Sequence, residues 1–170
     1  MTFTKAKKKR FFNKLFKITQ NEDNLNPYRN KILYKAGHFY ATDGYMIIDA
    51  FIPEYADLGQ TKTGDRFAVL EVEAWEDQAS NYISPRLMEL DISGVHDPIG
   101  KLEEFFHMAD KEKTDTEQKF DAKFMKTILE LFSIAGVYAA IDQRGVYVQF
   151  CGRNQEISID SILIGIRNKR

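Results

Sequence analysis

The chain has 170 residues, of which 44% are hydrophobic and 13% aromatic, enough for one domain with a substantial buried core. A single cysteine, Cys151, excludes an intramolecular disulfide, and no apolar run approaches the ~20 residues that span a bilayer. The start, MTFTKAKKKRFF, has no apolar segment of the kind found in signal peptides, so we predict a cytoplasmic protein.

The formal net charge is only −1, but charge is distributed unevenly along the chain. Residues 1–36 carry ten basic and two acidic residues, and residues 37–53 carry two acidic residues. Residues 54–118 carry sixteen acidic and six basic residues, whereas residues 119–170 carry eight basic and five acidic residues. This asymmetry favours a basic face for a polyanion and an acidic segment held away from it. Charged runs are, however, most often plain solvated surface.

The first predicted element is a helix over about residues 5–20. Its apolar residues recur with a period near 3.6 and fall on one arc, which predicts a core-facing side: Phe11, Phe12, Leu15, Phe16 and Ile18. Four cations without interleaved acids lie on nearly the opposite side: Lys7, Arg10, Lys14 and Lys17. Mixed-sign pairs usually stabilise an exposed helix, so this series is consistent with phosphate contact as well as with simple solvation.

Three short strands are predicted next, in KILYKAGHFYATD and YMIIDAFIP, with breaks at Ala36-Gly37 and Asp43-Gly44. Asp-Gly between β-rich runs is a strong hairpin signal, because glycine tolerates a positive φ and aspartate can bond its own backbone. With a strand predicted at Thr2–Thr4, the first third reads strand, helix and three strands.

The last third repeats that order. EQKFD is predicted as a strand, Asp121 as the N-cap of a helix that exposes Lys123 and Lys126, and Gly136 as the residue that ends it. A hairpin across residues 143–145 and a closing strand, ISIDSILIGIR, follow. We therefore predict an α+β fold with two strand-helix-strand-strand-strand halves, antiparallel sheets and both helices on one side, related by a pseudo-twofold.

Residues 54–118 form the acidic segment between the halves. A strand is predicted in RFAVLEVEAW, and a helix is predicted to open at Asp97-Pro98. The apolar side of that helix would be Ile99, Leu102, Phe105 and Phe106. The domain 1–170 is thus divided into a first half at 1–53, an inserted or linking segment at 54–118, and a second half at 117–170.

Catalytic and metal chemistry is not indicated by the residue pattern. His38, His96 and His107 share no ligand spacing with one another or with Cys151. The sequence contains no glycine-rich phosphate loop and no Gly-x-Ser-x-Gly elbow, and nothing pairs a nucleophile with a base. We predict no enzymatic activity, no metal and no cofactor.

Four stretches, in this order along the chain, resemble parts of a known protein family: TFTKAKKKRFFNKLFKITQ, NPYRNKILYKAGHFYATDGYMI, KFDAKFMKTILELF and ILIGIR. They resemble the first helix, the strands ending in Ala-Thr-Asp-Gly-His-Arg-Leu, the Phe-Asn-x-x-Tyr-Leu helix start and the Met-Pro-x-Arg tail of bacterial sliding clamps, the processivity factors of DNA polymerases. The resemblance covers about residues 1–53 and 117–170. It departs from the family at Tyr45-Met46-Ile47 and at Ile164-Gly165-Ile166-Arg167. Complete bacterial clamps carry three such domains, and this chain has enough for one.

The resemblance implies a DNA-clamp-like fold with two interaction surfaces. Family helices line a ring and hold duplex DNA by its phosphates, which permits sliding without sequence preference. The matching DNA-binding candidates are Lys7, Arg10, Lys14, Lys17, Lys123 and Lys126. Family partners dock peptides in an apolar pocket near the Thr-Asp-Gly turn. The matching peptide-binding candidates are Thr42, Gly44, Tyr45, Met46, Ile47, Ile164, Gly165 and Ile166.

Two functions remain open at this point. One is a non-enzymatic clamp-like protein of DNA replication or repair that binds duplex DNA and a peptide of a polymerase or repair protein. The other is a stand-alone protein-interaction module that does not encircle DNA. A ring would need about six copies, so we expect a monomer or dimer. Alanine at Met46 and Ile164 is expected to weaken peptide binding with little loss of stability, unless the isoleucines are ordinary core.

Overall fold

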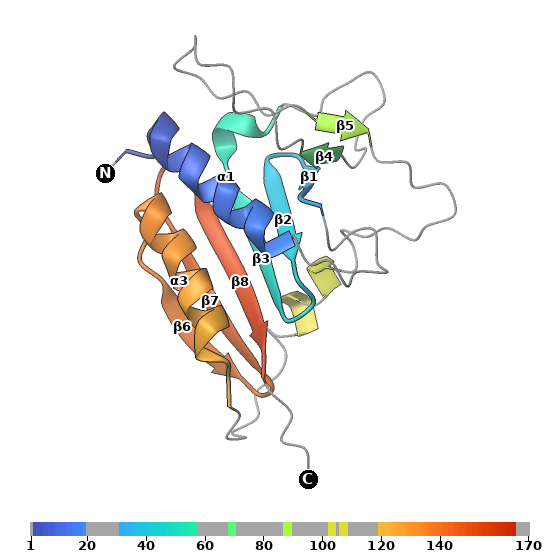
Figure 1. The fold of residues 1–170 in the computed structure, drawn as a ribbon, viewed down its shortest axis with the longest axis vertical. Helices are drawn as coiled ribbons and strands as arrows, with labels where there is room; N and C mark the ends of the chain where they lie inside the picture. Colours follow the sequence, from blue (N-terminus) through green and yellow to red (C-terminus); the bar gives the residue numbers. More distant parts are fainter. Residues whose placement is uncertain are drawn as a thin grey trace.

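A computed structural model describes residues 2–19, 31–57, 68–70, 87–89, 102–104, 106–108 and 119–165 (Figure 1). Two helices are present, α1 (Lys5–Thr19) and α3 (Ala122–Ala135), with a 3-10 turn, η1 (Pro53–Tyr55). The strands are β1 (Leu33–Lys35), β2 (His38–Thr42), β3 (Met46–Phe51), β4 (Ala68–Leu70), β5 (Leu87–Glu89), β6 (Ala140–Arg144), β7 (Tyr147–Arg153) and β8 (Ser158–Ile164). Among the described residues, no helix is both long and apolar enough to cross a membrane.

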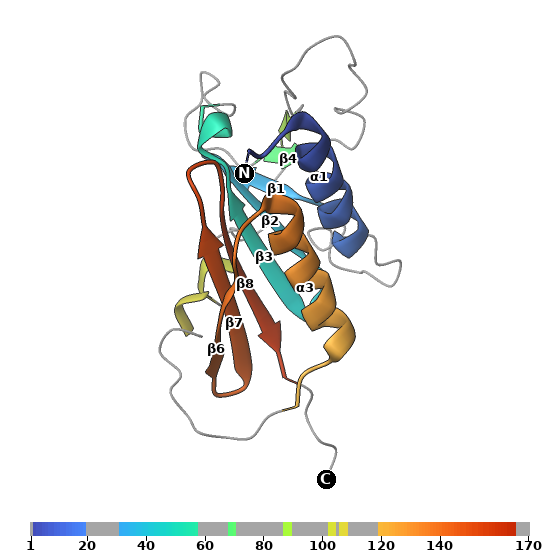
Figure 2. The same ribbon diagram turned by 90° about the vertical axis from the view of Figure 1, so that its left-hand side faces the viewer.

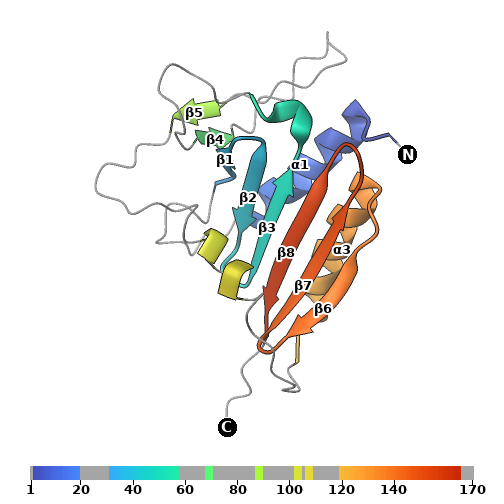
Figure 3. The ribbon, with the colours of Figure 1, turned by 180° about the vertical axis from the view of Figure 1, so that it is seen from behind.

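The strands form one antiparallel sheet in the order β5-β4-β1-β2-β3-β8-β7-β6. Strands β3 and β8 pair at its centre, from Met46 opposite Leu163 to Phe51 opposite Ser158. The order is therefore symmetric about this pair: β1-β2-β3 on one side is matched by β6-β7-β8 on the other (Figure 3). Only the first half is extended further, by β4 and β5. The predicted α+β class is confirmed.

Both helices lie against the same face of the sheet and contact each other (Figure 2). The predicted apolar arc of α1 is confirmed, since Phe11, Phe12 and Leu15 are completely buried. Helix α3 buries Ile128, Leu131, Phe132 and Ala135. The ring of Phe12 packs edge-on against Phe11 and against Phe39 of β2, with centroids 5.8 and 4.9 Å apart. Helices and sheet therefore share one continuous core.

The ends of α3 are those that its capping residues predict. The carboxylate of Asp121 accepts a hydrogen bond from the backbone N–H of Lys123 at 2.7 Å, which satisfies one free donor of the first turn. Gly136 adopts the left-handed conformation at φ 70°, and its N–H donates to the carbonyl of Ser133. Asp121 and Gly136 thus define both ends of the helix.

Among the described residues, neither Thr2–Thr4 nor residues 119–121 of EQKFD form a strand of the sheet, so the described part of each half reads helix-strand-strand-strand. At Thr2–Thr4 the backbone groups bond to other partners than a neighbouring strand. The N–H of Phe3 donates to the Glu156 carboxylate at 2.6 Å. The carbonyl of Thr4 accepts the first helical bond, from Lys8 at 2.9 Å. Within EQKFD, the described residues 119–121 make only an isolated bridge at Lys119 before the Asp121 cap. A few residues just before a helix offer their polar groups to the cap and leave too few for a ladder.

The predicted breaks between β1, β2 and β3 are confirmed. Ala36 and Gly37 both have positive φ, 48° and 87°, which suits a two-residue hairpin turn. In the second half, Arg144 pairs with Tyr147, so the turn lies at Gly145-Val146 and not across residues 143–145. Gly145 supplies the positive φ, 58°, that the turn requires.

Residues 102–104 and 106–108 are helical and lie on the sheet face opposite α1 and α3 (Figures 2 and 3). The Tyr40 hydroxyl of β2 donates to the Glu103 carboxylate at 3.0 Å. Leu102 and Phe106 are thus helical as predicted, while Asp97-Pro98, Ile99 and Phe105 lie outside the described residues. Of the predicted strand RFAVLEVEAW, residues 68–70 are described, as β4.

Candidate functional site

The first candidate surface is the solvent side of the two helices. Helix α1 contains seven basic and no acidic residues, and α3 contains two basic residues and one acidic residue. Arg10 and Lys17 are exposed on the side of α1 that faces away from the core, as predicted, and Lys123 and Lys126 are exposed on α3. We call the six predicted cations, Lys7, Arg10, Lys14, Lys17, Lys123 and Lys126, the basic helix face.

Two of those six cations are partly engaged within the protein. The Lys7 ammonium donates to the carbonyl of Thr2 at 3.2 Å. Lys14 forms an ion pair with Glu130 of α3, and the lysine side chain is 26% exposed. Helix α1 itself has no acid between its cations, as the sequence indicated, but the acid that pairs with Lys14 comes from the other helix. That partner was missed because it is distant in sequence.

The same ion pair affects Glu130. The hydrogen bond from the Lys14 ammonium, its charge and the charge of Lys126 hold the pKa of the Glu130 carboxyl below its usual value. Glu130 therefore remains ionised and offsets part of the positive potential between the helices. Arg10 and Lys17, by contrast, form no ion pair with any residue in the described ranges.

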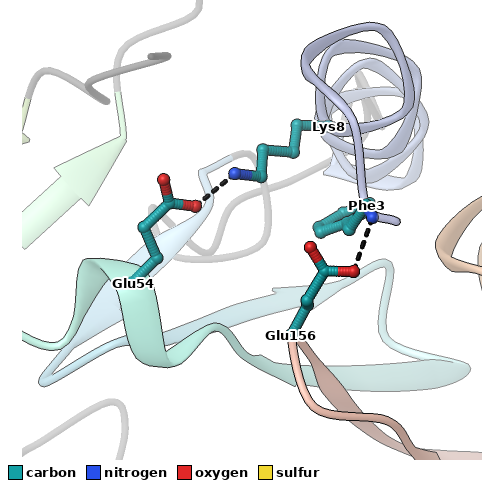
Figure 4. A network of polar contacts seen from close by, with 4 residues as sticks. All are labelled: Phe3, Lys8, Glu54 and Glu156. Atoms are coloured by element: carbon teal, nitrogen blue, oxygen red, sulfur yellow. Dashed lines mark hydrogen bonds and ion pairs between the residues drawn. The ribbon is translucent and has the colours of Figure 1, made fainter. Parts of the chain in front are cut away.

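Another cation of α1 is structural. Lys8 forms an ion pair with Glu54 of η1 (Figure 4). Its ammonium lies 5.9 Å from the Phe3 ring and 5.5 Å from the Tyr55 ring. The backbone of Phe3 is bonded to Glu156 beside it (Figure 4). These contacts tie the start of α1 to both halves of the sheet. Lys9, which the spacing argument omitted, is exposed next to Arg10 and extends the basic surface.

The second candidate surface surrounds the Thr42-Asp43-Gly44 turn. Asp43 Oδ1 accepts from the N–H groups of Tyr45 and Met46 at 2.8 and 2.9 Å. The Thr42 hydroxyl accepts from the Gly44 N–H at 3.0 Å and donates to the Met46 carbonyl at 2.8 Å. Gly44 takes a φ of 94°, where other residues are strained. The predicted turn is confirmed, and hydrogen bonds of the Thr42 and Asp43 side chains stabilise it.

The structure brings most of the predicted peptide-binding residues together. The N–H of Ile164 donates to the Tyr45 carbonyl at 2.9 Å, and the N–H of Gly165 donates to the Val146 carbonyl at 2.7 Å. Tyr45 is 59% exposed and its ring stacks on Phe124 of α3, with centroids 5.5 Å apart. Phe124 was missed because α3 follows in sequence some 80 residues later, about half the chain. Ile166 lies outside the described residues.

Met46 and Ile47 do not line this surface, because they are only 3% and 4% exposed. Met46 belongs to the core between helices and sheet. The expectation that alanine at Met46 leaves stability nearly unchanged is therefore wrong, since truncating a buried methionine typically costs about 2–5 kcal/mol. The accessible part of the candidate is therefore reduced to Tyr45, Phe124 and Ile164, which we call the Tyr45 surface.

Within the described ranges, no group of three or more His, Cys, Asp or Glu residues is arranged to hold a metal ion. The sequence matches no known protein-family model and no curated protein.

Proposed function

We propose that the chain is a non-enzymatic, clamp-like DNA-binding protein that holds duplex DNA without sequence preference along the basic helix face. The observation that carries the proposal is the pair of helices lying side by side on one face of a continuous sheet, with nine basic residues and one acidic residue in their sequences. Because both helices pack on one sheet, the backbone positions of their basic residues are fixed relative to one another, and one DNA backbone can contact several of them.

The chemistry of these side chains favours phosphates over bases. Arg10, Lys17, Lys123 and Lys126 are exposed long cations on helices, and such groups release counterions when they meet a DNA backbone. Phosphate contacts position a protein on the duplex but carry no sequence information. Binding of this kind permits movement along DNA, which is the behaviour expected of a clamp.

The position of Glu103 supports the same proposal. It lies on the sheet face opposite the helices, where Tyr40 holds it. An acidic group near the basic helix face would repel DNA, whereas one behind the sheet lies farther from it than the ~8 Å over which charges act at physiological ionic strength. Glu103 thus leaves the basic helix face accessible, and Glu54, which does reach α1, pairs with Lys8 outside that face.

The test is binding of two unrelated fluorescent duplexes, measured by anisotropy between about 50 and 200 mM salt. We expect equal affinities that fall steeply with salt. The double variant Arg10→Glu, Lys17→Glu should reduce the slope of log K against log salt by about 2, since two phosphate contacts are lost. The matched control is Arg153→Glu, at an exposed site at the end of β7, and it should leave the slope unchanged. Absence of duplex binding at low salt, or equal losses in both variants, contradicts the proposal.

The Tyr45 surface favours a second function, that of a peptide-binding module that does not encircle DNA. An exposed aromatic ring held rigid by stacking is the type of residue that dominates peptide interfaces. A synthetic peptide with one aliphatic and one aromatic anchor should bind at least about tenfold more weakly to Tyr45→Ala. Tyr138→Ala, at a tyrosine that is 97% exposed, is the control and should bind normally. Peptide binding that is lost equally in both variants, or never seen, excludes the module.

Light scattering with and without circular DNA separates these functions. We expect a monomer or dimer in isolation, because one domain covers a small arc of a ring. A closed hexamer that remains on circular DNA would instead show that copies of the chain encircle it.

A further inference from the structure

The outer face of the sheet, opposite the two helices, carries a polar cluster that the proposed function does not use. His38 of β2 shares a hydrogen bond with Asp49 of β3, with 2.9 Å between Nδ1 and Oδ1. The imidazole stacks on Tyr40, with ring centroids 5.9 Å apart and an interplanar angle of 14°. The Tyr40 hydroxyl in turn donates to Glu103. A continuous chain of contacts therefore leads from the central strands to the helical residues 102–104.

Charges around His38 are unbalanced. Asp49 lies directly opposite Asp160 of β8 in the central strand pair, and two like charges in that position destabilise a sheet. Glu103 adds a third carboxylate from the helical residues. Among the described residues, Lys35 of β1 is the one cation that the strand register places against His38. One protonated imidazole would therefore offset part of the repulsion among three acids.

The pKa of His38 responds to this environment. The hydrogen bond with Asp49 raises it above 6.5, burial partly opposes the rise, and the charges of Asp49, Glu103 and Asp160 raise it further. The charge of Glu103 thus acts on His38 across the gap between two separate elements. By reciprocity, the charge of His38 favours Glu103 in its docked position to the same extent.

We propose that His38 is a proton-controlled latch, and that its protonated form holds the helical residues 102–104 and 106–108 against the outer face of the sheet. Loss of the proton removes the imidazolium charge that attracts the Glu103 carboxylate, and the helical residues separate from β2. The sheet face that they cover then becomes accessible.

The direction of the pH dependence follows from the raised pKa. A histidine with a raised pKa in the docked state contributes its full stabilisation below the ordinary value of 6.5. That stabilisation decreases as the pH rises through the raised value. Docking of residues 102–104 and 106–108 is therefore strongest in mildly acidic solution and weakest in alkaline solution.

NMR titration of the His38 imidazole tests the coupling in the full chain. Glu103→Gln should lower the pKa of His38, because it removes a neighbouring negative charge. Glu104→Gln is the matched control: it removes the same charge one residue further along, from a side chain that does not contribute to the His38 pKa. Equal pKa values in wild type and Glu103→Gln, or equal shifts in both variants, overturn the proposal.

Hydrogen exchange tests the movement itself. After correction for the intrinsic pH dependence of exchange, protection of residues 102–104 and 106–108 in the wild type should fall several-fold between about pH 5.5 and about pH 8.5. In His38→Gln, which cannot carry the charge, protection should be low at both pH values. Unchanged protection in the wild type contradicts the latch. Neither experiment depends on DNA, so failure of the latch is distinguishable from failure of the proposed function.

Discussion

The two halves of the molecule share their backbone design but not their surface. The clearest shared device is the turn that joins the last two strands of each half. Asp43 Oδ1 accepts from the N–H groups of Tyr45 and Met46, and Asn154 Oδ1 accepts from those of Glu156 and Ile157, all between 2.8 and 3.0 Å. The offset that superposes these turns also carries Asp49 onto Asp160, so the pseudo-twofold passes through the centre of the β3-β8 pair.

Function-related differences lie outside this shared frame. Helix α1 has seven cations and α3 has two, and only the first half has its outer edge extended, by β4 and β5. By the same offset, His38 and Tyr40 correspond to Gln149 and Cys151, so the latch residues occur in one half only. The comparison teaches that the repeat preserves turns and core, whereas each half has its own surface chemistry.

The largest expected effect tests whether the halves share one core. Leu15 of α1 and Leu131 of α3 are both completely buried at matching places in their helices. Leu15→Ala and Leu131→Ala should each lower the free energy of unfolding by about 2–5 kcal/mol, through lost burial and the cavity left behind. Denaturant unfolding should show one transition in each variant, because strands β3 and β8 join the halves. Two separate transitions would show that the halves fold independently.

The shared turns should contribute equally. Asp43→Ala and Asn154→Ala each remove an oxygen that accepts two backbone N–H bonds, and each should cost about 1–2 kcal/mol. Thermal or denaturant unfolding measures both. A much larger loss in one variant would show that the turn has a further role in that half. The DNA affinity of both variants should remain that of the wild type, because neither side chain lies on the helices.

A smaller effect is expected where the repeat is imperfect in the core. Ser161 is completely buried, and its hydroxyl makes no hydrogen bond with any described residue. At the corresponding place the first half has Ala50, also completely buried. Ser161→Ala should raise the free energy of unfolding by about 1 kcal/mol, since it removes an unsatisfied buried hydroxyl. Ala50→Ser is the reverse control and should destabilise; a loss of stability in Ser161→Ala would show that the hydroxyl is satisfied.

Local chemistry explains which features could be predicted from the sequence. The period of apolar residues located both helices, Asp121 and Gly136 marked the ends of α3, and the glycine-containing breaks separated β1, β2 and β3. The Thr-Asp-Gly turn was predicted as a turn for the right reason, the Asp43 carboxylate. Asn154 accepts the equivalent two hydrogen bonds without an Asp-Gly sequence. This turn chemistry is therefore structural and does not by itself indicate a binding site.

Contacts between distant segments explain what could not be predicted. Pairing of Lys14 with Glu130, stacking of Tyr45 on Phe124 and docking of Glu103 on Tyr40 all join residues from separate elements. The strand predicted at Thr2–Thr4 does not form because the Phe3 N–H donates to Glu156, which is farther away in sequence than any of these partners. Met46 was assigned to a surface by its place in the motif that resembles sliding clamps, and a strand with both faces covered has no alternating pattern to reveal which side chains are accessible.

The smallest expected effect concerns the only acid on the two helices, where the halves meet. Glu130→Gln removes the partner of Lys14 and one negative charge from the basic helix face. If DNA phosphates bind that face, the freed Lys14 should add about one contact, strengthen duplex binding about threefold at ~0.1 M salt and steepen the salt slope by about 1. Anisotropy titrations measure both quantities. Glu104→Gln, which removes an exposed acid from the helical residues 102–104 on the opposite face of the sheet, is the matched control and should leave the slope unaltered. Weaker binding in Glu130→Gln would mean that the ion pair positions α1 for DNA, and an unchanged slope would place Lys14 outside the DNA contact.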